Sequence, residues 1–245
     1  MRTYLHLFGS KVTHDASYNG SDYHEPWVAF TNTQEPFVTY NKDKGNNGHK
    51  YVDLGLPSGT IWSTMNIGAS NESEFGDYFA WGETVGYSAS QVGVDKDFNQ
   101  SDYRFPFDQY DVPSKYNNTD RLTTLELEDD AARVHFGGLW HMPTIAQFDE
   151  LVSNTTSQWV ADYNGSGVSG RLYTASNGKS LFLPAAGNAS DGGVYMTNSS
   201  GGYWSNAIGM YGVDGAYEHG FDSSSGDDGG SVSRYLGLTI RPVIG

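Results

Sequence analysis

The sequence predicts an α+β domain with few helices, many short antiparallel strands and long loops. Charged residues make up only 18% of the 245 positions, aromatic residues make up 14%, and 31 residues are glycine. Long amphipathic helices need more Leu, Glu, Lys and Ala than this composition supplies, whereas aromatic residues and glycines are typical of short strands and turns. The length fits one large domain, with or without a short extension.

Residues 1–45 differ from the rest of the chain and are predicted to form an N-terminal extension for attachment or assembly. They contain two short strand-like runs, each directly after a proline, and they lead into the polar stretch 41–48, which is typical of a linker. An extra hairpin packed on the main domain is an equally consistent interpretation. The main domain then covers residues 46–245 and opens with a strand-like stretch, interrupted by turns, at 51–62.

Two helices are predicted after a long, aperiodic surface loop at 86–118. The first lies near 127–136, with the acidic residues 128–130 in its first turn, where the helix dipole favours negative charge. The second covers 144–152. Thr144 followed three positions later by Gln147 matches a capping box. The apolar residues of this segment share one helical face, namely Ile145, Phe148, Leu151 and Val152.

Two strand features are predicted in the C-terminal half. Asn177 and Gly178, between 171–176 and 179–184, predict a hairpin with a type I′ turn, in which both central residues have positive φ. The stretch 236–243 alternates apolar residues on one face and predicts a final strand half-buried in a sheet.

Composition also excludes several function classes. The net charge of -15, from 29 acidic and 14 basic residues, would repel nucleic acid and anionic membranes. Cysteine is absent, so disulfides, thiolate metal sites and cysteine nucleophiles are excluded. No apolar run is long enough for a signal peptide or a membrane span, so we expect no membrane insertion.

Residues 199–235, called here the recognition segment, have a distinct composition. Nine Gly, eight Ser, four Tyr, four Asp and one Asn together make 26 of these 37 positions. Tyr offers rigid contact area, Ser and Asn hydrogen-bond adaptably, and Gly bends the backbone, as in antibody loops. A flexible low-complexity loop would have a similar composition. Aromatic anchors such as Tyr203, Trp204 and Phe221 favour a loop that is pinned to a core.

A group of apolar residues within the recognition segment predicts an exposed contact patch. Ile208, Met210, Tyr211 and Val213 stand among polar residues and follow neither a strand nor a helix period. The alternative is that these four side chains belong to the core.

Several motifs occur in the order expected for one known family. They lie at 51–62 (YVDLGLPSGTIW), 76–84 (GDYFAWGET), 128–132 (EDDAA), 137–144 (GGLWHMPT), 181–187 (LFLPAAG), 203–205 (YWS), 216–217 (AY) and 237–243 (GLTIRPV). Over residues 50–245 the chain resembles the C-type-lectin-fold proteins of gut Bacteroidetes and their phages, which include the variable proteins of diversity-generating retroelements. The resemblance implies a C-type-lectin-like fold with a variable region at about 187–235.

In such variable proteins, adenine-directed mutagenesis changes surface codons and spares framework codons. The spared positions here would be Tyr203, Trp204, Ala216, Tyr217, Phe221, Arg234, Gly237 and the last strand. The resemblance implies ligand contacts at the scattered positions between them, namely Asn206, Ile208, Met210, Tyr211, Val213, Asp214, Glu218, His219, Ser223, Ser225, Asp227, Asp228, Ser231 and Ser233.

These observations predict a hypervariable binding protein on a phage tail or a bacterial surface, with a protein or glycan ligand on a cell surface. A non-diversified adhesin or carbohydrate-binding module of the same fold is the main alternative. An enzyme of this fold is the second alternative. We expect no catalytic residues, no cofactor and no metal.

One motif resembles an enzyme family that shares this fold. The stretch 141–148 (HMPTIAQF) is similar to a signature of formylglycine-generating enzymes, with His141 in place of their arginine. Their chemistry uses cysteines, which this chain lacks. The seven histidines show no metal-binding spacing. Asp222, Asp227 and Asp228 offer oxygen ligands for calcium, but solvated acids are the simpler interpretation.

Overall fold

The computed structural model describes residues 45–108, 111–209, 212–224 and 228–245. The predicted N-terminal extension therefore lies outside the described residues, apart from Gly45. The described chain is mostly β, with few helices and many short antiparallel strands in small sheets. Its elements, in order, are β1 (Tyr51–Val52), β2 (Ile61–Ser63), α3 (Ala131–Phe136), α4 (Ile145–Asn154), β3 (Thr155–Val160), η1 (Tyr163–Gly165), β4 (Gly170–Ala175), β5 (Ser180–Pro184), β6 (Asn188–Ser190), β7 (Gly193–Tyr195), β8 (Ser200–Ile208), β9 (Gly215–Asp222), β10 (Asp228–Ser233) and β11 (Val243–Ile244).

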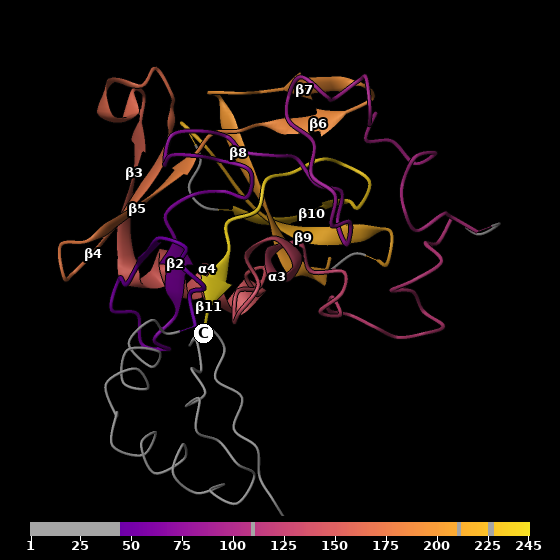
Figure 1. Cartoon of the computed structure of the whole chain (residues 1–245), viewed down its shortest axis with the longest axis horizontal. Helices are drawn as coiled ribbons and strands as arrows, with labels where there is room; N and C mark the ends of the chain where they lie inside the picture. Colours follow the sequence, from indigo (N-terminus) through magenta and orange to yellow (C-terminus); the bar gives the residue numbers. More distant parts are fainter. Residues whose placement is uncertain (1–44, 109–110, 210–211, 225–227) are drawn as a thin grey trace, which may run out of the picture. The chain divides into compact units, whose positions relative to one another are not determined.

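The strands form three sheets of three strands and one pair. The orders are β1-β2-β11, β3-β4-β5 and β10-β9-β8, and β6 pairs with β7. In Figure 1 the β3-β4-β5 sheet lies to one side of the β8–β10 sheet, and α4 lies below them. In the first sheet, Val52 and Val243 flank Trp62 in register, so the first and last strands of the described domain lie on either side of β2.

The β8–β9 pair separates two hydrophobic cores. Tyr203 and Phe221 belong to a cluster with Trp62, Phe148 and Tyr173. The neighbouring strand residues Trp204 and Ala216 belong to the other cluster, which also contains Trp81 and Trp140. Because successive strand residues point to opposite faces, the alternation of Tyr203 and Trp204 fills both cores. The two faces of this sheet therefore pack against different cores.

The second predicted helix is confirmed by α4. The Thr144 hydroxyl accepts from the Gln147 amide at 3.2 Å, and Gln147 Oε1 accepts from the Thr144 amide at 2.9 Å, so the capping box is complete. Phe148 and Leu151 are buried on the expected face. The helix continues two residues beyond the predicted end at 152.

The first predicted helix is shorter than expected. The helix α3 starts at Ala131, because Asp130 is its N-cap and accepts from the Arg133 amide at 3.0 Å. Residues 128 and 129 therefore precede the helix, and the prediction that acids occupy its first turn is wrong.

The hairpin β4–β5 is confirmed, but the type I′ turn is wrong. Gly178 has φ +80°, whereas Asn177 is not among the residues with positive φ. The Gly178 amide donates to the Ala175 carbonyl at 3.0 Å, as in a β-turn, and the Ala175 amide donates to the Lys179 carbonyl at 3.0 Å. The loop is thus one residue longer than a two-residue turn and has glycine in the left-handed position.

The observed burial of two stretches, 86–118 and 236–243, corrects two further predictions. The stretch 86–118 is irregular, as predicted, but it is not a surface loop, because Phe98, Tyr103, Phe105 and Tyr116 are buried in the core. The stretch 236–243 is not one half-buried strand. Residues 237–243 are buried without alternation, and only isolated bridges and the short β11 pair it with its neighbours. Among the described residues, no helix is long and apolar enough to span a membrane.

Candidate functional site

The recognition segment folds into the antiparallel sheet β10-β9-β8 and its loops. The pairing of β8 with β9 shifts register between Trp204 and Ile208, which marks a bulge or irregularity. Of the framework positions predicted within the segment, Tyr203, Trp204, Ala216, Phe221 and Arg234 are buried, whereas Tyr217 is only half-buried. The segment is therefore pinned to the core at intervals along its length.

Most of the predicted contact residues that the structure describes lie at least partly at the surface. Asp214 and Ser223 are exposed. Asn206, Ile208, Val213, Glu218, Ser231 and Ser233 are half-buried. Met210, Tyr211, Ser225 and Asp227 lie outside the described residues, as does the side chain of Asp228.

His219 does not belong to the contact surface, contrary to the prediction. Its side chain is only 2% exposed. The imidazole stacks on Phe148 of α4 with ring centroids 4.6 Å apart, and its Nε2 lies at hydrogen-bond distance, 2.8 Å, from the Tyr173 hydroxyl. The period of two along β9 places His219 on the same face as Phe221, and α4 and β4 cover that face.

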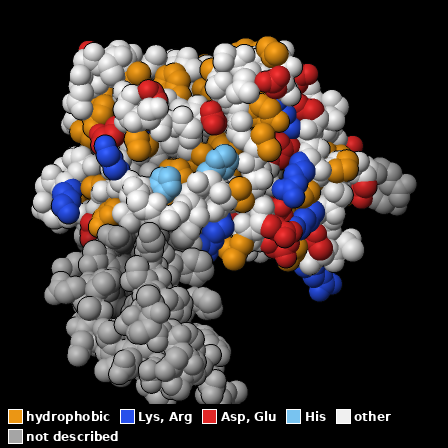
Figure 2. All heavy atoms as spheres, viewed as in Figure 1, with side chains coloured by type: hydrophobic (Ala, Val, Ile, Leu, Met, Phe, Trp, Pro, Cys, Tyr) orange, Lys and Arg blue, Asp and Glu red, His pale blue; other side chains and the backbone are white. Residues whose placement is uncertain are grey.

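The predicted exposed apolar patch is corrected as well. Ile208 is half-buried and packs against the core that contains Trp204. Val213 is half-buried, and its carbonyl accepts a hydrogen bond from Arg234. On the face shown in Figure 2, hydrophobic side chains of the described residues form small separate groups. Neither of the two described members is therefore fully exposed, and Ile208 contributes to packing.

Arg234 anchors the loop between β8 and β9 through an aromatic cage. The guanidinium is fully buried and lies over the rings of Trp81, Tyr103, Phe105 and Tyr116, at 4.6–5.7 Å from the centroids. It donates to the Tyr103 hydroxyl and to the carbonyls of Lys115, Tyr116 and Val213 at 3.0–3.1 Å. One residue therefore ties the loop at 213 to the buried stretch 103–116.

Glu218 is the one predicted contact residue with a clearly perturbed carboxyl. It lies in the middle of β9, opposite Trp204 of β8 and Gly230 of β10. Burial raises the pKa of the Glu218 carboxyl to about 7. Among the described residues, none forms a hydrogen bond or an ion pair with this carboxyl.

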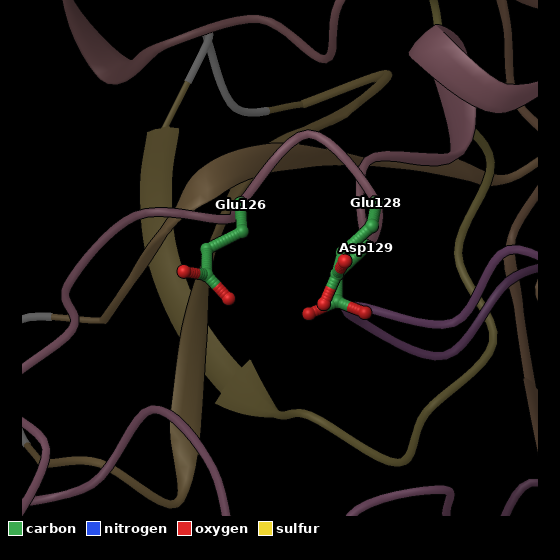
Figure 3. A group of neighbouring side chains, drawn as sticks. All are labelled: Glu126, Glu128 and Asp129. Carbon is green, nitrogen blue, oxygen red and sulfur yellow. The ribbon is translucent and has the colours of Figure 1, made fainter.

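A second group of acids lies outside the recognition segment. Figure 3 shows the carboxylates of Glu126, Glu128 and Asp129 pointing toward one another, and single oxygens of the three lie within 4.8 Å of each other. The Lys115 ammonium already lies among them, at 2.6, 3.5 and 2.5 Å respectively. This lysine takes the place that a bound cation would need.

The buried member of this group is held in its charged form. Burial alone would raise the pKa of Asp129, but hydrogen bonds from Lys115 and Tyr116 and the nearby Arg104 charge lower it overall. Arg104 Nη1 lies 2.7 Å from Asp129 Oδ1, an ion pair without the angles of a hydrogen bond. The group is best explained as an ion-pair network that fixes the stretch 104–129.

Comparisons with known protein families, curated proteins and solved structures found no match. The interpretation of the site therefore depends on its own geometry and on the sequence motifs.

Sequence reasoning missed the ion-pair network and the cage. The acidic run at 126–129 and the isolated Lys115 were visible as charges, but their pairing spans a stretch that looks like a loop. Calcium at Asp222 is not favoured, because one of its oxygens accepts from the amide and the hydroxyl of Ser224. The side chains of Asp227 and Asp228 lie outside the described residues.

The raised pKa of Glu218 predicts a pH-dependent effect of Glu218→Gln on stability. In the folded protein the carboxyl takes up a proton below about pH 7, whereas in the unfolded chain it does so only near pH 4.3. The wild type therefore loses stability as pH rises through this window. Relative to wild type, the glutamine variant is expected to gain up to about 3 kcal/mol in free energy of unfolding between about pH 4 and pH 8.

Urea denaturation at a series of pH values measures this difference. Glu128→Gln is the matched control, because it removes one negative charge from a side chain that is 75% exposed. A constant difference between Glu218→Gln and wild type across this pH range would contradict the prediction.

Proposed function

We propose that this chain is a ligand-binding protein of the C-type-lectin-like class, and that the recognition segment carries its binding surface. One observation supports this proposal most directly. The anchors at 203, 204, 216, 221 and 234 are buried, while Asp214 and Ser223, which lie between them, are exposed. Such a surface tolerates side-chain changes without unfolding, because its frame is held by other residues.

The arrangement of the first and last strands is consistent with the proposed fold. The strands β1 and β11 lie on either side of β2, so the described domain is closed by its own ends. The strands β8–β10 come late in the sequence, far from β1 and β2. This separation is expected if β8–β10 carry the binding surface and the β1-β2-β11 sheet closes the domain. The family motifs at 137–144 and 203–205 support the same assignment, since they supply the helix cap Thr144 and the buried pair Tyr203 and Trp204.

An enzymatic function has weaker support. Glycoside hydrolysis by two carboxyl groups requires them about 5–9 Å apart, each with a distinct environment. Glu218 has a raised pKa, but no second ionised group of the described residues contributes to the shift. Recognition is therefore the function that the geometry supports best.

A binding experiment tests the proposed recognition surface. The first variant carries alanine at three positions, Asp214, Ser223 and Ser233. Its melting temperature is expected to stay within about 3 °C of wild type, since changes at surface positions of this kind have small effects on stability. Binding of the labelled full chain to intact bacterial cells, measured by flow cytometry, is expected to fall at least about tenfold, or about 1.4 kcal/mol.

Alanine at Thr156 and Gln158 on the exposed part of β3 is the matched control. Equal loss of binding in both variants, or in neither, would contradict the proposal. Sequencing the gene in a natural population separates a diversified protein from a fixed adhesin. Diversification predicts changes at the codons of Asp214 and Ser223, with the codons of Tyr203 and Trp204 unchanged.

A further inference from the structure

Glu218 is a carboxylate whose position is not explained by folding. It is half-buried at the centre of β9, and no described residue donates a hydrogen bond to it or forms an ion pair with it. Asp129, which is also buried, is instead bound by Lys115 and Tyr116. A half-buried carboxylate that has no partner among the described residues can pair with a group from outside the chain.

Two glycines make room for the Glu218 carboxylate. A Cβ atom at Gly202 of β8 would lie 2.7 Å from Glu218 Oε2, and a Cβ at Gly230 of β10 would lie 3.7 Å from Oε1. The carboxylate thus lies over the backbones of the two neighbouring strands. Leu238 borders the same space, since its Cδ2 would lie 3.2 Å from the added Cβ at Gly202. We call this arrangement of Glu218, Gly202, Gly230 and Leu238 the Glu218 bay.

The basic residues of the recognition segment and its neighbourhood are engaged elsewhere. Arg234 is enclosed in its aromatic cage. Arg171, on β4, donates to the carbonyl of Asp222 at 2.9 Å. Neither forms an ion pair with Glu218.

We propose that the Glu218 bay binds a cationic side chain, lysine or arginine, of a protein ligand. The inference rests on the proposed function and names the chemistry of its ligand. A cation supplies the charge and the hydrogen-bond donors that the carboxylate lacks. The net charge of -15 favours a basic partner over an acidic one.

The pKa of Glu218 gives a direct readout of this binding. Burial raises this pKa to about 7, and a bound cation stabilises the charged form and lowers it. The experiment uses the full chain with ¹³C-labelled glutamate, and the Glu218 carboxyl resonance is assigned by its absence in Glu218→Gln. The pKa is measured in n-butylammonium chloride and in sodium chloride at the same ionic strength.

The expected result is a saturable change of the Glu218 resonance and a fall in its pKa of about one unit in n-butylammonium, which corresponds to tenfold tighter binding to the ionised form. An equal pKa in the two salts would overturn the inference. Gly202→Ala is the second variant. It displaces the carboxylate and keeps its charge, so the response to n-butylammonium should be lost. A full response in Gly202→Ala would show that the bay is not the binding site.

Cell binding separates this inference from the proposed function. Glu218→Gln is expected to reduce binding at least about tenfold, and Glu128→Gln is the charge-matched control. If the Asp214, Ser223 and Ser233 variant loses binding while Glu218→Gln retains it, the inference fails and the proposed function stands. If both variants retain wild-type binding, the inference and the proposed function both fail.

Discussion

Replacing Arg234 by alanine is expected to lower the free energy of unfolding by about 4 kcal/mol. The substitution removes four hydrogen bonds and leaves the carbonyls of Lys115, Tyr116 and Val213 without their donor. It also empties a space that four aromatic rings enclose. Burial lowers the pKa of Arg234, so desolvation of the guanidinium offsets part of the stabilisation that these contacts give.

Urea denaturation followed by tryptophan fluorescence measures this loss, because Trp81 lies under the guanidinium. Arg234→Met separates the effect of volume from that of hydrogen bonding, because methionine fills the cage but has no donors. This variant should be more stable than Arg234→Ala and less stable than wild type. Arg121→Ala is a control at an exposed arginine outside the cage. A loss of under about 1 kcal/mol in Arg234→Ala would mean that the cage contributes little to the fold.

Replacing Trp204 by alanine is expected to cost about 4 kcal/mol of stability, in the range usual for large buried aromatic side chains. The indole is fully buried, and its Nε1 donates to the Phe79 carbonyl at 2.7 Å. Truncation leaves a cavity between β8 and the core, and it leaves that carbonyl with the Leu238 amide as its remaining donor. Thermal unfolding followed by circular dichroism gives the measurement.

Trp204→Phe keeps most of the apolar volume and loses the donor, so a smaller cost of about 2 kcal/mol is expected. Trp159→Ala provides the comparison with a tryptophan that is only half-buried. Equal losses for Trp204→Ala and Trp159→Ala would contradict the assignment of Trp204 as a framework residue.

Local signals in the sequence predicted part of the fold correctly. The capping box of α4 is complete within four residues, so tertiary contacts are not needed to recognise it. The β4–β5 hairpin was likewise indicated by Asn177 and Gly178, although the turn type depends on one residue of loop length. The burial of the stretches 86–118 and 236–243 was predicted wrongly, because it is decided by distant partners such as Phe79 and Arg234.

The sequence likewise predicted only those parts of the candidate site that local signals indicate. The anchors Tyr203 and Trp204 stand out in the sequence because large aromatic residues are rare among Gly and Ser. His219 was misplaced, because a polar residue in a Gly-rich segment is expected at the surface unless the opposite face of its strand is known to be covered. Here α4 covers that face, and no local pattern near 219 indicates it.

The row formed by Val52, Trp62 and Val243 has a mechanical consequence. Adjacent strands lie about 4.8 Å apart, so Val52 and Val243 are separated by about 10 Å across Trp62. A tensile load applied between the two ends of the described domain would enter through these neighbouring strands. Rupture would begin at the β1–β2–β11 sheet, and the strands β8–β10 would bear force only after that sheet had opened.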